Sequence, residues 1–294
     1  MTGTVAEERP ARPLGELVDP AKSYGLIDVW RRRYLMRLLV AKEIRVRYQG
    51  SLLGLLWTYV KPLVRFTVYF FVFGYIFGLG GRVENFAVYV FSGIVVLNLF
   101  LEALASSTRS VRGNSGLINK IFLPREMFPL VSVVVSTRHF LPQMAVLVVV
   151  AVAYGWTPSV ESLASALAGF TIIVLFLVGL GLIFSTFNVY FRDAEQIVEI
   201  ITMVAFWSAP IMYPWTFLRD VIGDGWLLTL YLSNPLTVAV NYFHEAFWAP
   251  TTDNPVEFPD LSIAGPVSVA IVVTTVVVGQ VMFSRLQGRF ASEL

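Results

Sequence analysis

Six apolar stretches divide the chain, and each approaches the length of about 20 residues that an α-helix needs to cross about 30 Å of hydrocarbon. Only 14% of the 294 residues are charged and 56% are hydrophobic, which leaves too little polar surface for a water-soluble globular protein. The sequence therefore predicts an all-α integral membrane protein with six transmembrane helices, the fifth being the shortest. The predicted spans are residues 63–79, 86–106, 130–154, 163–187, 197–212 and 264–283.

The basic residues indicate on which side of the membrane each loop lies. With the N-terminus inside, the inner segments hold 18 of the 22 lysines and arginines, and the outer loops hold only Arg82 and Arg219. Cytoplasmic loops of membrane proteins carry this excess of positive charge, so we expect an inner (plasma) membrane protein with both termini in the cytoplasm. An alternative topology has five spans, with residues 197–212 dipping into the membrane and returning. That topology places the last basic residues outside.

Residues 1–27 form a polar tail that lacks the basic start and apolar run of a signal peptide. In residues 28–48, which follow, apolar and aromatic side chains recur at steps of three and four. This pattern predicts an amphipathic helix that lies flat at the inner membrane surface. The helix either anchors the topology or gates a substrate entrance. The basic residues of this helix are Arg31, Arg32, Arg33, Arg37, Lys42, Arg45 and Arg47. Residues 49–294 form the transmembrane domain.

The loop between the second and third spans contains a second short amphipathic segment, residues 115–123. Ile118, Ile121 and Phe122 fall on one side of it, with Lys120 nearby, and the helix is expected to end before Pro124. A helix this short is unstable in water unless it packs on a surface. The membrane is one candidate surface, and a partner protein fits better.

The outer segment, residues 213–262, is too apolar and aromatic for a simple loop. Its apolar runs, residues 215–218, 226–232 and 236–248, are too short to cross the bilayer, and prolines separate them. We expect short re-entrant helices between the fifth and sixth spans. Non-helical backbone at membrane depth needs protein or a water-filled passage around it, so this segment favours a transport pathway. An extracellular packing cap is the alternative.

The motifs of common enzymes are missing from the sequence. No Gly-Lys-Ser or Gly-Lys-Thr phosphate loop, His-Glu-x-x-His site or nucleophile elbow is present. There is no cysteine and only two histidines, so no metal site is expected. Inside the spans, Arg65 is expected to reach toward the inner surface, and Glu102 and Arg138 are predicted to form a structural ion pair because lone charges are costly there. A place for the pair in the translocation path is the alternative.

Four stretches carry a resemblance to a known family. They are YQGSLLGLLWTYVKPL at residues 48–63, GLINKIFLPREMFPL at 116–130, NVYFRDAEQIVEIITMVAFWSAPIMYP at 188–214, and YLSNPLTVAVNYF at 231–243. In this order they are similar to the polysaccharide-exporting branch of the type-2 ABC transporter permeases, which export O-antigen, capsule and teichoic acid chains. Within that branch the chain resembles most the permeases that export lipid-linked galactan in mycobacterial-type cell envelopes.

The resemblance implies a homodimer in which each copy binds one soluble ATPase subunit. That subunit would bind ATP and Mg, leaving this chain without a cofactor. The short inner helix would be the ATPase-coupling helix, and the surface helix would gate the entry of a glycan linked to undecaprenyl or decaprenyl diphosphate. The implied partners are therefore a second copy, two ATPase subunits, the lipid-linked glycan and membrane lipids, and no nucleic acid. The implied coupling residues are Ile118, Lys120, Ile121, Phe122, Pro124 and Arg125, and the implied diphosphate residues are Arg31, Arg32, Arg33 and Arg37.

The first and fifth spans would line the central channel, and their aromatic side chains suit a glycan because sugar rings stack on aromatic faces. The predicted channel residues are Trp57, Tyr59, Tyr69, Phe70, Phe206, Trp207, Tyr213 and Trp215. Aromatic belts at the membrane surface explain part of the same pattern. Two other functions compete with glycan export. One is a permease of this superfamily that exports a drug or another lipid, and the other is a membrane glycosyltransferase or acyltransferase.

Overall fold

The computed structural model describes residues 25–50, 54–118, 123–191, 193–253, 255 and 259–294. All regular secondary structure in these ranges is helical. The prediction of an all-α fold is therefore confirmed.

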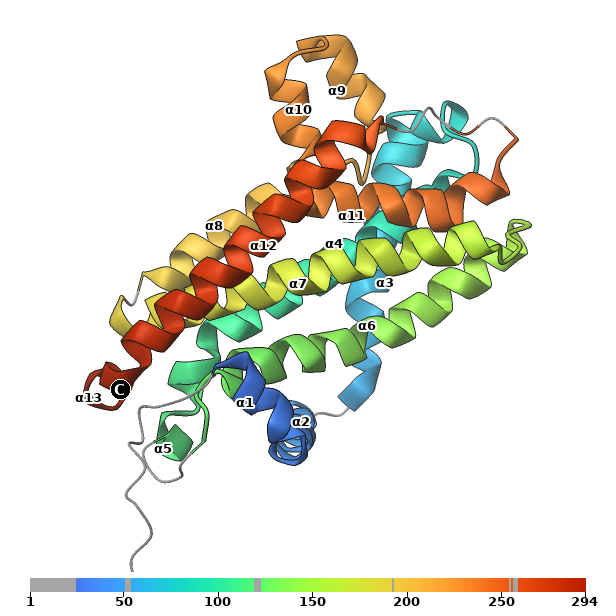
Figure 1. Cartoon of the computed structure of the whole chain (residues 1–294). Helices are drawn as coiled ribbons and strands as arrows, with labels where there is room; N and C mark the ends of the chain where they lie inside the picture. The colour runs from blue at the N-terminus through green and yellow to red at the C-terminus, as the bar shows by residue number, and fades with distance from the viewer. Residues whose placement is uncertain (1–24, 51–53, 119–122, 192, 254, 256–258) are drawn as a thin grey trace, which may run out of the picture.

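Four long helices form the centre of the molecule (Figure 1). They are α4 (Phe86–Gly113), α6 (Met127–Ala153), α7 (Val160–Tyr190) and α12 (Leu261–Leu286). Each is long and apolar enough to cross a membrane, and they correspond to the predicted second, third, fourth and sixth spans. Helix α4 is the most enclosed because it packs against α6, α7, α8 and α11.

Helices α7 and α12 approach each other so closely that their backbones touch. A methyl group on Gly179 would lie 2.7 Å from the backbone of Thr275 and Val276, and one on Gly279 would lie 2.6 Å from the carbonyl oxygen of Gly179. Small residues at such crossings allow helices in lipid to gain van der Waals contact. These two glycines therefore fix how the fourth and sixth predicted spans pack.

The regions predicted as the first and fifth spans contain shorter helices. Residues 63–79 fall in α3 (Trp57–Tyr69), the π-helical turn η2 (Phe70–Ile76) and the start of the 3-10 turn η3 (Leu79–Gly81). Residues 197–212 fall in α8 (Ala194–Trp207) and the irregular segment after it. At about 1.5 Å per residue, the 14 residues of α8 cover roughly 21 Å. The crossing of the membrane by these two segments stays a prediction.

The segment before α12 consists of short helices, as predicted. These are α9 (Trp215–Ile222), α10 (Trp226–Leu232), α11 (Pro235–Phe243), the π-helical turn η4 (His244–Trp248) and the 3-10 turn η5 (Ala249–Thr251). Helix α11 and η4 are buried against α4 and α7. The Tyr89 hydroxyl lies 2.8 Å from the Pro210 carbonyl and 3.1 Å from that of Tyr213. It thereby satisfies the non-helical backbone between α8 and α9.

The predicted surface helix, residues 28–48, is two helices rather than one. Helix α1 (Leu26–Arg31) ends at a non-helical residue, Arg32, and α2 (Arg33–Tyr48) begins directly after it. The backbone of Arg32 has φ −96° and ψ 33°, outside the α-helical region. Helix α2 packs against α6, so its orientation is set by a neighbouring helix as well as by its own polarity.

Helices α1, α2, α5 (Ser115–Ile118) and α13 (Phe290–Glu293) gather at one end of the bundle, far from α9 and α10 (Figure 1). We call this the basic end, because it carries the arginines of α2 together with Arg109, Arg112, Arg125, Arg285 and Arg289. Arg82 and Arg219 lie near or in the elements at the opposite end. Helix α5 covers only part of predicted segment 115–123, and residues 119–122 lie outside the described residues.

Candidate functional site: a polar cleft at the basic end

A cleft of about 790 Å³ lies between α2, α3, α4 and α6. It follows α4 from Asn114, at the basic end, to Asn98 near the middle of that helix. The 16 residue steps between them correspond to roughly 24 Å of helix, so the cleft extends well into the depth of the bundle. Its charged and aromatic lining residues are Lys42, Glu43, Arg47, Tyr48, Trp57, Arg65, Glu102, Arg109 and His139.

Cations outnumber acids in this lining. Lys42 donates a hydrogen bond to Asn114 Oδ1 at 2.7 Å and lies 3.8 Å from Glu43. Arg109 lies 3.5 Å from Glu195 of α8. Arg65 donates to the side-chain oxygen of Asn98, a neutral amide. No ion pair involving Arg65 is found among the described residues.

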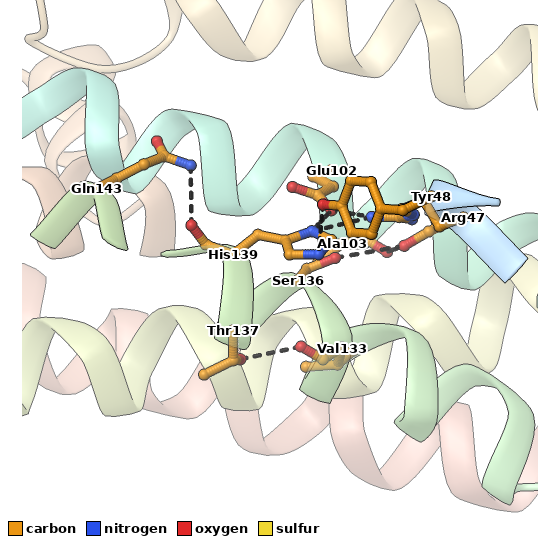
Figure 2. A network of polar contacts seen from close by, with 10 residues as sticks. Arg47, Tyr48, Glu102, Ala103, Val133, Ser136, Thr137, His139 and Gln143 are labelled. Atoms are coloured by element: carbon orange, nitrogen blue, oxygen red, sulfur yellow. Dashed lines mark hydrogen bonds and ion pairs between the residues drawn. The ribbon is translucent and has the colours of Figure 1, made fainter. Parts of the chain in front are cut away.

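Glu102 of α4 is the centre of a polar network at the wall of the cleft (Figure 2). Arg47 of α2 donates a hydrogen bond to Glu102 Oε1, and His139 Nδ1 of α6 lies 2.5 Å from the same oxygen. The Tyr48 hydroxyl lies 3.0 Å from His139 Nε2, and its ring meets the imidazole edge-on at 5.7 Å. This network ties the surface helix α2 to two long helices of the bundle.

The network continues toward the interior of the molecule. Gln143 donates to the His139 carbonyl at 3.2 Å, and Asn98 donates to Gln143 Oε1 at 3.1 Å. Because Arg65 donates to Asn98, hydrogen bonds connect α3, α4 and α6. The His139 imidazole extends these contacts to Tyr48 of α2. Polar groups inside a membrane protein need such partners, since lipid offers none. The arrangement gives the cleft a fixed polar wall.

The predicted ion pair between Glu102 and Arg138 is wrong. Glu102 pairs with Arg47 and His139 instead, and the Arg138 side chain is exposed on another face of α6. The prediction compared only the depths of residues in the spans, so it could not include a residue from the surface helix. A signal for the true partner was present, because His139 and Gln143 have the same four-residue spacing as Asn98 and Glu102.

The arginines predicted to bind diphosphate, Arg31, Arg32, Arg33 and Arg37, are exposed and do not line the cleft. They lie in or between α1 and α2, before the part of α2 that reaches Glu102. The structure brings Arg47 and Arg65 to the cleft instead. From the sequence, Arg47 is one of several charges of the surface helix, and Arg65 is expected to reach toward the inner surface.

The eight predicted channel aromatics are partly brought together. Tyr69 of α3 packs on Phe206 of α8 with ring centroids 4.8 Å apart, and Trp207 packs edge-on against Phe206 at the same distance. The Tyr213 hydroxyl donates to the Trp207 carbonyl at 2.8 Å. Of the remaining four, Trp57 lines the cleft, Tyr59 is exposed, Phe70 stacks on Phe66, and Trp215 is buried with Arg219 over its ring.

Trp215 therefore does not fit the predicted channel surface. Its side chain is only 8% exposed and belongs to a small apolar cluster with α10 and α12. The aromatic pattern alone could not distinguish it from Trp207, which is 57% exposed. The difference arises because α9 folds back against α10, which a pattern of residue types does not reveal.

The predicted coupling residues that the structure describes pack within the chain. Ile118 and Pro124 are buried, and Ile118 joins an apolar cluster formed by the ends of α4, α6, α7 and α12. Arg125 donates to the Gln287 carbonyl. This contrasts with the prediction that the Ile118 side chain faces a partner: the chain itself supplies the surface that so short a helix needs. Lys120, Ile121 and Phe122 lie outside the described residues.

The site's chemistry is that of a binding surface for an anionic or hydroxylated ligand. Guanidinium groups bind phosphate oxygens through paired hydrogen bonds, and the amides of Asn98 and Gln143 suit hydroxyl groups. No group of three acidic, histidine or cysteine side chains able to hold a metal ion is found among the described residues. Glu102 and His139 form an acid–imidazole pair in the wall of the cleft.

Comparison with known proteins places this architecture in a family. An O-antigen export system permease protein RfbA of Klebsiella pneumoniae is 32% identical over 270 residues, covering 89% of this chain and 96% of the relative. An RfbA of Myxococcus xanthus is 26% identical over 225 residues, covering 75% and 83%. The polysialic acid transport protein KpsM of Escherichia coli is 22% identical over 219 residues, covering 73% and 81%. The family model described as ABC-2 type transporter matches residues 34–248, and the chain therefore belongs to the ABC-2 type transporter family.

Proposed function

We propose that the chain is the membrane-spanning subunit of an ATP-driven exporter that moves a polysaccharide, carried on a lipid diphosphate, out of the cytoplasm. The relatives named as O-antigen permeases and a polysialic acid transport protein support a polysaccharide cargo. Galactan on undecaprenyl or decaprenyl diphosphate is the specific cargo that the sequence resemblance favours. The proposed location of the protein is the inner membrane, with six spans and both termini in the cytoplasm. This topology would place the basic end of the bundle on the cytoplasmic side.

The observation that carries the proposal is the charge of Arg65 in the cleft. A lone cation in the interior of a membrane protein costs about 3 kcal/mol on insertion scales, and Arg65 is bonded to the neutral amide of Asn98. A diphosphate entering from the basic end would supply the missing negative charge and accept paired hydrogen bonds. Lys42 and Arg47 lie along the same cleft and would guide it there.

The test compares two arginines that both lie in predicted spans. Arg65→Gln removes the proposed diphosphate contact, and Arg138→Gln removes an exposed arginine outside the cleft. A hydrogen bond to a charged group contributes about 1.5–3 kcal/mol, so Arg65→Gln should reduce export of a lipid-diphosphate-linked galactan by about tenfold or more in vesicles containing the complete transporter. Arg138→Gln should stay near the wild-type rate. Equal rates for both variants would contradict the role of the cleft.

The arginines Arg31, Arg32 and Arg33 offer a competing location for the same headgroup. Replacing all three with glutamine should lower the rate of cargo capture if they meet the diphosphate first, and should leave the maximal export rate unchanged if Arg65 holds it. Measuring export against cargo concentration separates the two effects. A loss of maximal rate in the triple variant, with a normal rate in Arg65→Gln, would move the binding site to α1 and the start of α2.

The transporter is proposed to contain two copies of this chain and two copies of an ATPase subunit that binds ATP and Mg. Exposed aromatic residues on α3 and α8, including Trp57 and Trp207, support a surface for a second copy and a glycan track beside it. Because the chain has no cysteine, Trp207→Cys permits specific cross-linking between copies in membranes. The absence of a cross-linked dimer would contradict this arrangement.

The proposed ATPase docking site is the loop that includes α5. Phe122→Asp should abolish co-purification of the ATPase, since an apolar contact would be replaced by a charge. The matched control is Tyr75→Asp, a substitution of an exposed aromatic residue in η2, on the other side of the molecule from α5. Unchanged co-purification of Phe122→Asp would refute the docking assignment while leaving the cleft proposal intact.

A membrane glycosyltransferase is the second candidate, because the structure places a carboxylate against an imidazole in the cleft. The Glu102 to His139 distance of 2.5 Å resembles the acid–base pairs of enzymes. Both ring nitrogens of His139 are occupied, however, since Tyr48 lies 3.0 Å from Nε2. Turnover of a lipid-linked sugar by the purified chain without any ATPase would favour the enzyme and exclude the permease proposal.

A further inference from the structure

Residues 287–294 fold back onto residues 123–126, which precede α6. Helix α12 ends at Leu286 and is followed by the 3-10 turn η6 (Gln287–Arg289) and by α13 (Phe290–Glu293). Arg125 donates a hydrogen bond to the backbone carbonyl of Gln287. These contacts join parts of the sequence about 160 residues apart.

A buried side-chain contact strengthens this junction. The Gln287 amide donates to Glu126 Oε1 at 3.1 Å, and the two residues are 4% and 0% exposed. A buried carboxylate is costly unless it is hydrogen-bonded, so this bond fixes both partners. The Tyr190 hydroxyl of α7 donates to the Leu286 carbonyl at 2.8 Å and holds the end of α12 from the other side.

Phe290 links the same segment to the apolar cluster that contains Ile118 and Phe128. Its ring is fully buried, lies 5.2 Å from Phe283 and 6.1 Å from Tyr190, and carries the Arg125 guanidinium 6.0 Å from its centroid. Ile118 and Leu123, which flank residues 119–122, belong to or pack against this cluster. Both described sides of the loop are thus held by contacts that include the C-terminal segment.

We propose that Gln287 and Phe290 are positioning residues, which hold Ile118 and residues 123–126, on either side of the loop between α5 and α6, in the orientation that transmits ATPase movement to the bundle. The inference rests on the proposed docking of the ATPase at this loop. The C-terminal segment touches Arg125, Glu126 and the cluster around Ile118 rather than the cleft. Its loss should therefore reduce the number of cargo molecules exported for each ATP hydrolysed, with little change in cargo binding.

The test exchanges the two buried hydrogen-bonding partners. Gln287→Glu places two carboxylates against each other and should release the segment, whereas Glu126→Gln combined with Gln287→Glu restores one N–H···O bond and the original charge. Gln287→Ala is a milder variant if Gln287→Glu does not fold. Arg285→Gln, an exposed change just before this segment, is the control.

Two readouts follow the loop and the coupling separately. Gly116→Cys gives a unique attachment point for a nitroxide in this cysteine-free chain, and a side chain there meets no atom within 4 Å. In the full-length chain the fraction of mobile nitroxide should rise about 5- to 30-fold in Gln287→Glu, the effect of losing one buried contact. It should return to the starting value in the exchanged double variant. The ratio of export to ATP hydrolysis should fall and recover in parallel.

An immobile nitroxide in folded Gln287→Glu, or a double variant that does not recover, would overturn the proposal. A nitroxide that responds as expected but is unaffected by bound ATPase would leave the positioning role standing. That result would instead contradict the docking of the ATPase at this loop.

Discussion

Gly279 of α12 is the position at which one added methyl group should disturb the bundle most directly. That methyl group would lie 2.6 Å from the carbonyl oxygen of Gly179 and 3.2 Å from Cβ of Leu182. Ordinary van der Waals contact begins at 3.4 Å, so Gly279→Ala requires α7 and α12 to separate by about 0.8 Å. Neither helix can yield by rotating a flexible side chain, because the nearest atom belongs to the backbone.

The cost follows from the area over which the two helices are packed. A gap of about 0.5–1 Å forfeits roughly a quarter to a half of the dispersion attraction between the atoms that it separates. Packing, rather than the hydrophobic effect, holds helices together in lipid. Overpacking of this kind costs about 1–3 kcal/mol, and each kcal/mol corresponds to about 2–4 °C in apparent Tm for a chain of this size.

The assay is the loss of monodisperse protein on heating in detergent, with all variants heated at the same rate because such unfolding is irreversible. The control is Gly81→Ala, whose methyl group would meet no atom within 4 Å. An apparent Tm for Gly279→Ala equal to that of the wild type would refute the close crossing of α7 and α12. A fall of the same size in Gly81→Ala would refute its attribution to that crossing.

Three further predictions concern single groups. Tyr89→Phe removes the hydroxyl bonded to carbonyl groups after α8 and should cost about 1–3 kcal/mol in thermal stability, whereas Tyr75→Phe, an exposed change, should have no effect. Hydrogen bonds from Ser262 lower the pKa of Asp260, which caps the N-terminus of α12. The cap therefore stabilises the fold at neutral pH, and this stabilisation is lost as the pH falls through the lowered pKa. Asp260→Asn should keep the cap and abolish this acid-dependent loss of thermal stability. Trp207→Ala should slow glycan export while ATP hydrolysis by the complex continues, and an unchanged export rate would remove Trp207 from the proposed track.

The long helices were predictable because each contains an apolar run of about 20 residues, which is long enough to cross the bilayer. The predicted second span begins at Phe86, where α4 begins, and the predicted fourth span lies entirely inside α7. The first and fifth regions were harder. In the first region, α3 gives way to a π-helical turn after Tyr69, and in the fifth, α8 gives way to irregular backbone before Pro214. Hydropathy measures composition and not continuity of backbone hydrogen bonds, so it does not show where the helices in these two regions end.

The site was only partly predictable, because its contacts join residues that no local pattern connects. The Arg47 to Glu102 contact spans 55 residues and unites a surface helix with a buried one. The sequence indicated correctly that Glu102 needs a cation, since a lone charge in a span is costly. Arg138 was predicted as the partner because its depth in the third span matched that of Glu102. Its side chain is exposed, however, and the side chain of the next residue, His139, is buried against Glu102.

The close packing of α4, α6, α7 and α12 divides the molecule into parts of unequal stiffness. These four helices share the most extensive contacts in the bundle, and two of them meet backbone to backbone at Gly179. Helices α2, α3 and α8 have fewer partners in the bundle than α4 and α7 do. A well-packed unit resists small deformations and moves as one body, so we expect any widening that lets a polymer pass to come from displacement of these three peripheral helices. The four helices of the unit would then keep their positions relative to one another while the peripheral helices move.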